Sequence, residues 1–409
     1  MKIQWQKLKI LLEHSFRHVP YYKKLFNDLK ITPNDIRSEE DFKQLPQLTK
    51  RIIQKNYHDL IAENFKPKEL NENATGGSSG EMMIFYQDVY RNDLRRGYVL
   101  RHDSWTGWKV GEKIALIWGS DRDIPNHRNL KTKMRMKFLE RKLWLNAFDL
   151  NEKKVIGFAK KLQKYKPSMI IGYANALYLF YKFVSNNQIL LPSVKGIISS
   201  AETLYKYQRT LIESVSGSKI YNRFGCREVG LIASECPYHN GLHLNAENIY
   251  FEINNDKKLK LENDMGEVIV TDLLNFGMPL IRYNMKDIVK TTNRACECGR
   301  GLPLIDKVSG RTSDMIMTKD GSFIHGEYFT HLFYGIPGIK KFQLVQKKNW
   351  SIIIEIECDF KLDESKFDFI KDKVKNTVPN NDVILKIVDK INVPASGKHQ
   401  FTISEINHM

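Results

Sequence analysis

The spacing of apolar residues changes character along this chain of 409 residues. Near the start, apolar side chains recur every three or four positions, as they do on one face of a helix. These residues are Leu8, Leu11, Leu12 and Phe16. The proline-bearing turn at 18–22 then interrupts the pattern. Residues 1–70 are therefore predicted to form helices joined by turns.

From about residue 100 onward, the sequence contains short apolar runs that end in small or polar residues. The runs are 114–118, 169–171, 196–198 and 219–221. Helical patterns over 177–184 and 207–215 alternate with them. This alternation favours α/β layers around a largely parallel sheet, whose ligands bind beyond the carboxyl ends of the strands. We therefore expect a binding site at the polar turns that follow these runs.

The last part of the chain predicts antiparallel strands and then a small separate domain. The antiparallel pattern covers 248–253, 267–272 and 287–292, with a turn at 264–266. Beyond residue 310, three strand patterns surround one helical face. The strands are 341–345, 351–357 and 383–388, and the helical face carries Phe367, Ile370, Val374 and Val378. The predicted organisation is a helical segment over 1–70, a core over 71–310 and a small α+β domain over 311–409.

Composition places the chain among globular proteins. A hydrophobic content of 42% can bury a large core, and no apolar run is long enough to span a bilayer. The first residues lack an export signal, so we expect a cytoplasmic protein. The formal net charge is +17, but the lysines are scattered and no basic run is interleaved with aromatics. Nucleic-acid binding is therefore only a weak alternative, and a homodimer is left open.

Five cysteines are too few for a disulfide framework, but their spacing indicates a metal site. Cys236, His239 and His243 lie close in sequence, and Cys296 and Cys298 follow much later. Thiolates and imidazoles are the ligands that zinc prefers. We predict a structural zinc site formed by Cys236, His243, Cys296 and Cys298, with His239 as an alternative ligand. The two cysteines one residue apart could instead be buried apolar groups.

One short segment is dense in glycine and hydroxyl side chains. It consists of Thr75, Gly76, Gly77, Ser78, Ser79 and Gly80. Glycine permits positive φ, so several backbone amides can converge on one phosphate group. The Walker pattern and the dinucleotide fingerprint are both absent, and such a segment alone could be a plain surface turn. It predicts nucleotide binding only in combination with other motifs.

Such motifs follow in one particular order. They are Ser-Ala-Glu-Thr at 200–203, Asn-Arg-Phe-Gly-Cys-Arg-Glu at 222–228, Arg-Tyr-Asn-Met-Lys-Asp at 282–287, Gly-Arg-Thr-Ser-Asp at 310–314 and Ser-Gly-Lys at 396–398. Together with the loop at 75–80, they resemble the adenylate-forming superfamily of acyl-CoA ligases, luciferases and peptide-synthetase adenylation domains. Segments 106–113 and 296–303 resemble the phenylacetate-CoA ligase-like branch, which includes relatives linked to capsular polysaccharide biosynthesis. The resemblance covers roughly residues 70–400.

This resemblance implies binding of ATP and Mg²⁺. The loop at 75–80 would hold the β- and γ-phosphates, and Glu228 would be the magnesium ligand. Asp287 would accept hydrogen bonds from the ribose hydroxyls, and Arg311 would reach the ribose and the phosphates. The adenine slot would be formed by Ala201, Glu202, Thr203, Asn222, Arg223, Phe224 and Gly225.

A mobile small domain is also implied. Lys398 would bridge the substrate carboxylate and the α-phosphate, and Asp314 would be the hinge. Residues 105–108 and 172–175 are candidates for lining the carboxylate pocket. The chain departs from the family pattern at Glu81, Arg227, Met285 and Phe401.

The implied reaction joins a small-molecule carboxylate to AMP and releases pyrophosphate, after which an acceptor takes the acyl group. Coenzyme A is the acceptor in an acyl-CoA ligase. An amine, such as an amino sugar of surface polysaccharide biosynthesis, is the alternative acceptor. A non-catalytic nucleotide-binding protein is the alternative from another functional class.

Overall fold

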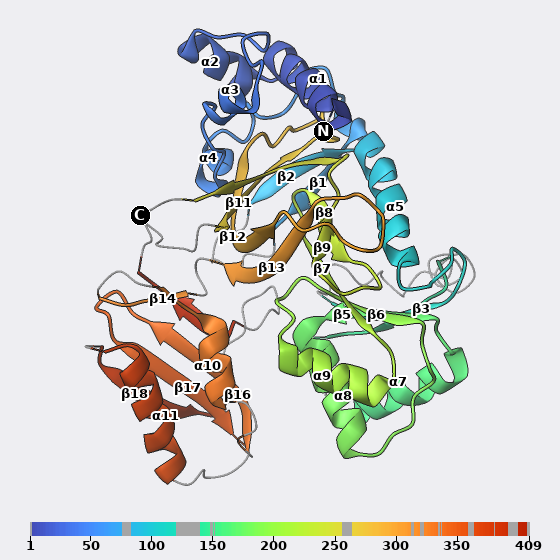
Figure 1. Ribbon diagram of the computed structural model, residues 1–409, viewed down its shortest axis with the longest axis vertical. Coiled ribbons are helices and arrows are strands. Elements are labelled where there is room, and N and C mark those ends of the chain that lie inside the picture. The colour runs from blue at the N-terminus through green and yellow to red at the C-terminus, as the bar shows by residue number, and fades with distance from the viewer. Residues whose placement is uncertain are drawn as a thin grey trace. The chain divides into compact units, whose positions relative to one another are not determined.

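The computed structural model describes most of the chain (Figure 1). The described residues are 2–75, 83–119, 140–147, 150, 152–255, 264–311, 315–319, 323–333, 336, 338–358, 364–379, 381–391 and 400–406. The chain divides into two compact units. The large unit comprises 1–252, 269–285 and 291–308, and the small unit comprises 253–268, 286–290 and 309–409.

The large unit begins with four helices, as the apolar spacing predicts. They are α1 (Lys2–His18), α2 (Pro20–Leu29), α3 (Glu39–Lys43) and α4 (Lys50–Lys55). Leu8, Leu11 and Leu12 are all buried on one face of α1. Helix α3 begins at a capping box, because Ser38 Oγ accepts from the Asp41 amide (3.1 Å) and Asp41 Oδ2 accepts from the Ser38 amide (2.8 Å).

A two-stranded hairpin and one long helix follow. The hairpin pairs β1 (Leu70–Ala74) with β2 (Ile84–Asp88), and α5 (Val89–Ser104) begins directly after it. Thr75 and Met83 close the base of the connection, since the Thr75 amide donates to the Met83 carbonyl (2.9 Å) and the Met83 amide donates to Thr75 Oγ1 (2.9 Å). Residues 76–82 of the connection lie outside the described residues.

The described residues also form an eleven-stranded sheet in the order β10-β11-β12-β13-β9-β8-β7-β6-β5-β3-β4. One half is parallel, as predicted, and runs from β4 to β7. Its strands are β3 (Ile114–Ile117), β4 (Lys142–Leu145), β5 (Met169–Tyr173), β6 (Gly196–Ser200) and β7 (Ile220–Cys226). From β7 to β8 and from β8 to β9 the pairing is antiparallel. The remaining strands are β8 (Gly230–Glu235), β9 (Leu242–Leu244), β10 (Ile249–Asn254), β11 (Met265–Asp272), β12 (Tyr283–Thr292) and β13 (Leu304–Arg311).

Three helices lie side by side along the parallel strands in Figure 1 and bury a continuous core. They are α7 (Glu152–Tyr165), α8 (Ala174–Asn186) and α9 (Lys206–Ser216). Phe158, Phe180 and Ile212 come from the three helices, and each is almost completely buried against strand residues such as Ile197. This packing fixes the carboxyl ends of β5, β6 and β7 relative to one another.

The small unit contains a second sheet and its own core. The sheet order is β18-β17-β16-β19, and a separate hairpin pairs β14 with β15. Its elements are β14 (Met315–Met317), β15 (Phe323–His325), α10 (Gly326–Phe333), β16 (Ile339–Gln346), β17 (Ile352–Cys358), α11 (Glu364–Thr377), β18 (Val383–Val388) and β19 (Thr402–Ser404). Ile370, Val374 and Val378 are buried against the sheet, as the helical pattern predicts. The predicted α/β class with a small α+β C-terminal part is therefore confirmed.

Within the described residues, no helix combines the length and the apolar character needed to cross a membrane.

Asp88 joins the hairpin, α5 and the segment after β11, and we expect its removal to destabilise the large unit. Its Oδ1 accepts from the Arg91 amide (2.7 Å), and its Oδ2 accepts from the Phe276 amide (2.9 Å). Asp88→Ala should lower the free energy of unfolding by about 3 kcal/mol, because two buried amides lose a charged partner. Urea denaturation followed by circular dichroism measures this. Asp93→Ala, on the exposed side of α5, is the matched control, and an equal loss in both variants would contradict the assignment.

Candidate functional site

The first two predicted motifs lie on neighbouring parallel strands. β6 ends at Ser200, which pairs with Arg223 of β7, so the segments 200–203 and 222–225 meet at the same edge of the sheet. Ala201 has φ of 69°, a conformation that is strained for a residue other than glycine. Glu202 Oε2 accepts from the Asn175 amide at the start of α8 (2.9 Å). The turn after β6 is thus held to the turn after β5.

Residues of the β7 motif at 222–225 are held by contacts within the large unit. Phe224 is 7% exposed, and the Asn222 amide donates to Glu235 Oε2 (2.8 Å). Arg223 forms an ion pair with Asp103 at the end of α5, and both side chains are largely buried. No pattern in the sequence predicts this pair. The family resemblance implies that Arg223 belongs to the adenine slot, whereas its guanidinium is engaged with α5.

A tight turn between β7 and β8 carries Glu228. A Cβ added at Gly225 would lie 2.3 Å from the Gly230 carbonyl oxygen, so the two ends of the turn can approach only because residue 225 is glycine. Side chains from the hairpin and from α5 hold the turn. Gln87 Nε2 donates to the carbonyl of Arg227 (2.8 Å) and to that of Glu228 (3.1 Å), and Arg91 Nη2 also donates to the Glu228 carbonyl (3.2 Å).

Tyr283 orients the carboxylate of Glu228. Its hydroxyl donates to Glu228 Oε1 at 2.9 Å, and the Glu228 residue is only 7% exposed. The sequence contained one signal for this contact, because Tyr283 belongs to the motif at 282–287. The neighbouring Arg227 Nη1 donates to the Ala74 carbonyl (3.4 Å), directly before Thr75. The predicted magnesium ligand and the start of the glycine-rich loop are thus connected by one side chain.

The segment 282–287 contains two residues with positive φ. Arg282 has φ of 53° and Lys286 has φ of 62°. Arg282 is held by Glu252, with 3.0 Å between Nη2 and Oε1. Lys286 is held by Glu267, since its Nζ lies 3.1 Å from both carboxylate oxygens. These ion pairs stabilise an unfavourable backbone beside Asp287, which lies in β12.

Several predicted site residues cannot be placed. Gly76, Gly77, Ser78, Ser79 and Gly80 lie outside the described residues, as do Asp314 and Lys398. Arg311 ends β13, and only its backbone is described. Their roles stay predictions. Phe401, which replaces an arginine of the family pattern, packs against Phe342 in the core of the small unit, with ring centroids 5.1 Å apart.

The cysteine and histidine residues form a compact cluster. The ligand atoms of Cys236, His243, Cys296 and Cys298 all lie within 4.8 Å of one another. Cys236 Sγ lies 3.7 Å from Cys296 Sγ, and Cys298 Sγ lies 3.3 Å from His243 Nε2. Three sulfurs and one imidazole at these separations form a donor set that could hold a tetrahedral zinc ion. The cluster joins the β8–β9 connection to the segment before β13.

His239 is not part of this cluster. Its Nδ1 lies 3.1 Å from Glu235 Oε2, and Arg209 Nη2 donates to both oxygens of the same carboxylate (2.7 and 2.9 Å). Despite burial, the hydrogen bond from His239 and the charge of Arg209 hold the pKa of Glu235 below its usual value. The geometry therefore selects His243 rather than His239 as the imidazole donor.

The surroundings of the cluster affect its thiols in opposite directions. Burial and the neighbouring Cys296 raise the pKa of Cys236 to about 12. Although burial opposes it, hydrogen bonds from Arg300 lower the pKa of Cys298 to about 7. Arg300 also stacks on Trp105, with its guanidinium carbon 4.8 Å from the ring centroid. A cation would therefore find one thiol that is easily deprotonated and another whose deprotonation needs the cation.

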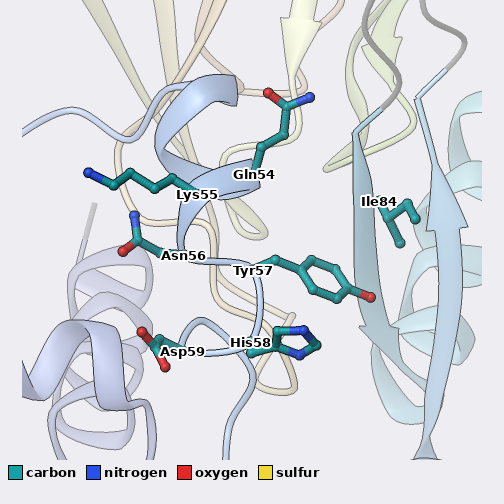
Figure 2. A pocket seen from close by; sticks show the side chains of 7 residues that line it. All are labelled: Gln54, Lys55, Asn56, Tyr57, His58, Asp59 and Ile84. Carbon is teal, nitrogen blue, oxygen red and sulfur yellow. The ribbon is translucent and has the colours of Figure 1, made fainter.

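A cavity of about 460 Å³ lies near the hairpin. Figure 2 shows Tyr57 pointing across it toward Ile84, the first residue of β2, while Lys55 and Asn56 point away from that strand. The lining includes the polar side chains of Gln54, His58 and Asp59. Tyr57 and Tyr86 are ring neighbours, with centroids 5.7 Å apart. The lining of this cavity includes none of the predicted ATP-site or metal-site residues, so the cavity does not extend the candidate site.

Several known proteins are similar in sequence to this chain. Residues 316–405 match the CapK C-terminal domain family. Protein CapK of Staphylococcus aureus is 23% identical over 99% of this chain and 89% of its own length. Phenylacetate-coenzyme A ligase of Escherichia coli is 23% identical over 78% of this chain and 72% of its own length. The predicted resemblance to the adenylate-forming ligases, in their phenylacetate-CoA ligase-like branch, is thus confirmed.

Solved structures show that this chain shares its fold with enzymes of several activities. A 2-hydroxyisobutyryl-CoA ligase with 2-HIB-AMP has a TM-score of 0.74 at 16% identity, covering 98% of this chain and 89% of that one. The amide bond synthetase McbA of Marinactinospora thermotolerans has a TM-score of 0.54 at 13% identity, covering 81% and 67%. The fold is thus common to ligases with different acyl acceptors.

Proposed function

We propose that this ligase uses ATP to activate a carboxylate as an acyl-adenylate and then transfers the acyl group to coenzyme A. The observation that carries the proposal is the Glu228 turn. A largely buried carboxylate, oriented by Tyr283, lies beside the carboxyl end of β7, where ligands of such sheets bind. CoA ligases recur among the relatives and among the structural neighbours, which supports coenzyme A as the acceptor.

Each residue would contribute binding or charge rather than a covalent step. Glu228 would hold Mg²⁺, which when bound neutralises charge on the phosphates of ATP. Phe224 would offer a flat apolar face to adenine, and Asp287 would accept hydrogen bonds from the ribose. Lys398 would lie between the substrate carboxylate and the α-phosphate and stabilise the charge that develops there. Positioning and electrostatics thus supply the catalysis.

An amine acceptor is the second candidate. The small unit matches the CapK C-terminal domain, and the relative CapK is similar over nearly the whole chain. In this reading the enzyme would form an amide on an amino sugar of a surface polysaccharide. Incubation with ATP, a panel of carboxylates and either acceptor separates the two by product mass. A protein that binds ATP without exchanging labelled pyrophosphate would instead be a non-catalytic nucleotide-binding protein.

We also propose that the cluster of Cys236, His243, Cys296 and Cys298 binds a structural zinc ion. The ion would join two segments that are about 60 residues apart in sequence, and three thiolates with one imidazole form a donor set typical of closed zinc sites.

Glu228→Gln should lower the rate of carboxylate-dependent pyrophosphate exchange by about 100-fold, because an amide oxygen is a much weaker magnesium ligand than a carboxylate. Part of the loss should be recovered at high Mg²⁺ concentration. The exchange rate as a function of Mg²⁺ measures both effects. Glu63→Gln, at an exposed position, is the control. A rate that is unchanged in Glu228→Gln would remove the proposed role.

Lys398→Ala should abolish adenylate formation but spare acyl transfer from a supplied acyl-adenylate. The lysine would neutralise charge only during attack on the α-phosphate. Pyrophosphate exchange measures the first step, and release of AMP from synthetic acyl-adenylate in the presence of coenzyme A measures the second. Equal loss of both steps would refute this role.

The purified protein should contain about one zinc ion per chain, and Cys296→Ser should remove it. Loss of the ion should lower the midpoint of thermal unfolding by about 5 °C or more, because metal binding contributes to folding. Elemental analysis and differential scanning calorimetry measure the two effects. His239→Ala, which lies outside the cluster, should retain the ion. A metal-free protein of undiminished stability would argue against the site.

A further inference from the structure

The inward face of α5 is polar rather than apolar. Arg91, Arg95, Tyr98 and His102 follow one another at helical spacing, and all but Arg95 are buried. Arg91 is fully paired, because its Nε lies 2.9 Å from Asp272 Oδ2 and both side chains are buried. Burial and the charges of Arg101 and Arg223 lower the pKa of His102 to about 2, so its imidazole is neutral.

Arg95 is a half-buried cation that lacks a close counterion among the described residues. Within the described part of the chain, no carboxylate lies within ion-pair distance of its guanidinium, and no group is hydrogen-bonded to it. Burial lowers the pKa of Arg95 and repulsion by the neighbouring Arg91 adds to this effect, while the nearby Tyr98 and the charge of Asp272 oppose it. Burying a charge is unfavourable unless the charge is paired. Among the described carboxylates, Asp272 attracts Arg95 at longer range than an ion pair, so the guanidinium can still accept a close counterion.

Tyr98 places a second donor beside Arg95. Its ring is 6% exposed, and its hydroxyl has no hydrogen-bond partner among the described side chains and backbone groups. Burial raises the pKa of Tyr98 to about 12, so the hydroxyl keeps its proton and can donate. The guanidinium of Arg95 and the hydroxyl of Tyr98 both keep some exposure to solvent. Neither is among the described side-chain atoms that are fully buried and lack a hydrogen-bond partner. A guanidinium and a phenol are thus open to the same ligand.

Both donors border the turn that carries Glu228. A Cβ added at Gly230 would lie 3.0 Å from Tyr98 Oη and 3.2 Å from Arg95 Nε. Gly230 follows Glu228 by two residues, and its φ of 84° is favourable only for glycine. Apolar groups adjoin the donors, because Tyr98 packs with Leu231 and Leu274. The surroundings therefore combine an apolar wall with a cationic end, which suits an organic acid with an apolar stem.

We propose that Arg95 and Tyr98 bind a second anionic group on the acyl substrate, so that the enzyme activates a dicarboxylic acid at one of its two carboxyl groups. This inference rests on the proposed adenylate-forming reaction. One carboxylate would react with ATP near Glu228, and the other would pair with the guanidinium of Arg95. A carboxylate accepts from both donors at once and supplies the charge that Arg95 lacks. Arg95 would then determine specificity and would not take part in the chemical step.

The test compares matched acids in pyrophosphate exchange. The pairs are propanoate with succinate, phenylacetate with 1,4-phenylenediacetate, and alanine with aspartate. The wild-type enzyme should prefer the dicarboxylic member of at least one pair. Arg95→Met, which keeps the length of the side chain but not its charge, should lower kcat/KM for that acid by about 30-fold. The value for its monocarboxylic partner should change less than about threefold, since that acid does not need the cation.

Further variants separate a role in specificity from a role in structure. Arg95→Lys should retain part of the preference for the dicarboxylic acid that Arg95→Met loses. Tyr98→Phe should weaken this preference by about fivefold relative to the wild-type enzyme. Arg96→Gln, which is exposed on the same helix, should leave it unchanged. In all of these variants, the KM for ATP should stay within about twofold of the wild-type value. A larger rise of this KM in Arg95→Met would assign the arginine to the phosphates of ATP and overturn the proposal.

The remaining outcomes are also decisive. A wild-type enzyme that discriminates in none of the three pairs overturns the proposal, as does an equal loss for both members of a pair in Arg95→Met. Calorimetric titration with ATP and with AMP keeps this result apart from a failure of the proposed function. Binding of ATP without dicarboxylate preference refutes only the role of Arg95. Absence of nucleotide binding refutes the adenylate-forming reaction itself.

Discussion

The buried ion pair between Arg91 and Asp272 is the contact on which the candidate site depends. Both side chains are almost fully inaccessible, and the same guanidinium donates to the carbonyl of Glu228. A buried pair of this kind is not in itself strongly stabilising, but breaking it by removing one partner costs about 3–5 kcal/mol. The pair therefore fixes α5 to the end of β11 and to the Glu228 turn in one arrangement. The orientation of Glu228 toward Tyr283 follows from that arrangement.

Helix α5 extends this constraint over the whole edge of the sheet. At its first turn Asp88 holds the segment after β11, and at its last turn Asp103 pairs with Arg223 of β7. Trp105, directly after the helix, makes an edge contact with His243 of the cysteine and histidine cluster, with ring centroids 5.6 Å apart. The candidate magnesium ligand and the candidate zinc cluster are thus both connected to one rigid element. That arrangement keeps the glycine-containing β7–β8 turn in position.

The sequence predicts the apolar parts of this fold better than the polar ones. The strand at 169–171 and the helix around Phe180 follow from apolar periodicity, because both are buried in the main core. Helix α5 was not predicted, because its inward face consists of arginine, tyrosine and histidine and therefore shows no apolar stripe. Strand β8 was missed for a related reason, since it lies between two turns and includes the buried Glu235.

The same contrast holds for the candidate site. Motif order predicted Glu228 as a candidate, and the spacing of cysteine and histidine predicted the four residues that cluster, because those residue types carry their chemistry in any surroundings. Gln87 and Arg91 could not be identified, because each acts through a contact with a residue distant in sequence. Tyr283 belongs to a predicted motif, but its contact with Glu228 could not be predicted for the same reason. Sequence spacing also favoured His243 while leaving His239 as an alternative ligand. Only the geometry separates them, because Glu235 and Arg209 engage His239 in an ion-pair network.

The ion-pair partners of the arginines on and beside α5 explain why its polar face has consequences for function. In a chain with a formal net charge of +17, an extra exposed arginine changes little, because water and salt screen it. A half-buried arginine differs, because its desolvation is offset only by a partner at close range. Arg91 has such a partner in Asp272, and Arg223 has one in Asp103. Arg95 lies on the same helix face and lacks one among the described residues, so its charge is available to a ligand. The apolar wall beside it then limits which anions can approach, and this favours an acid with a hydrocarbon stem over a hydrated inorganic ion.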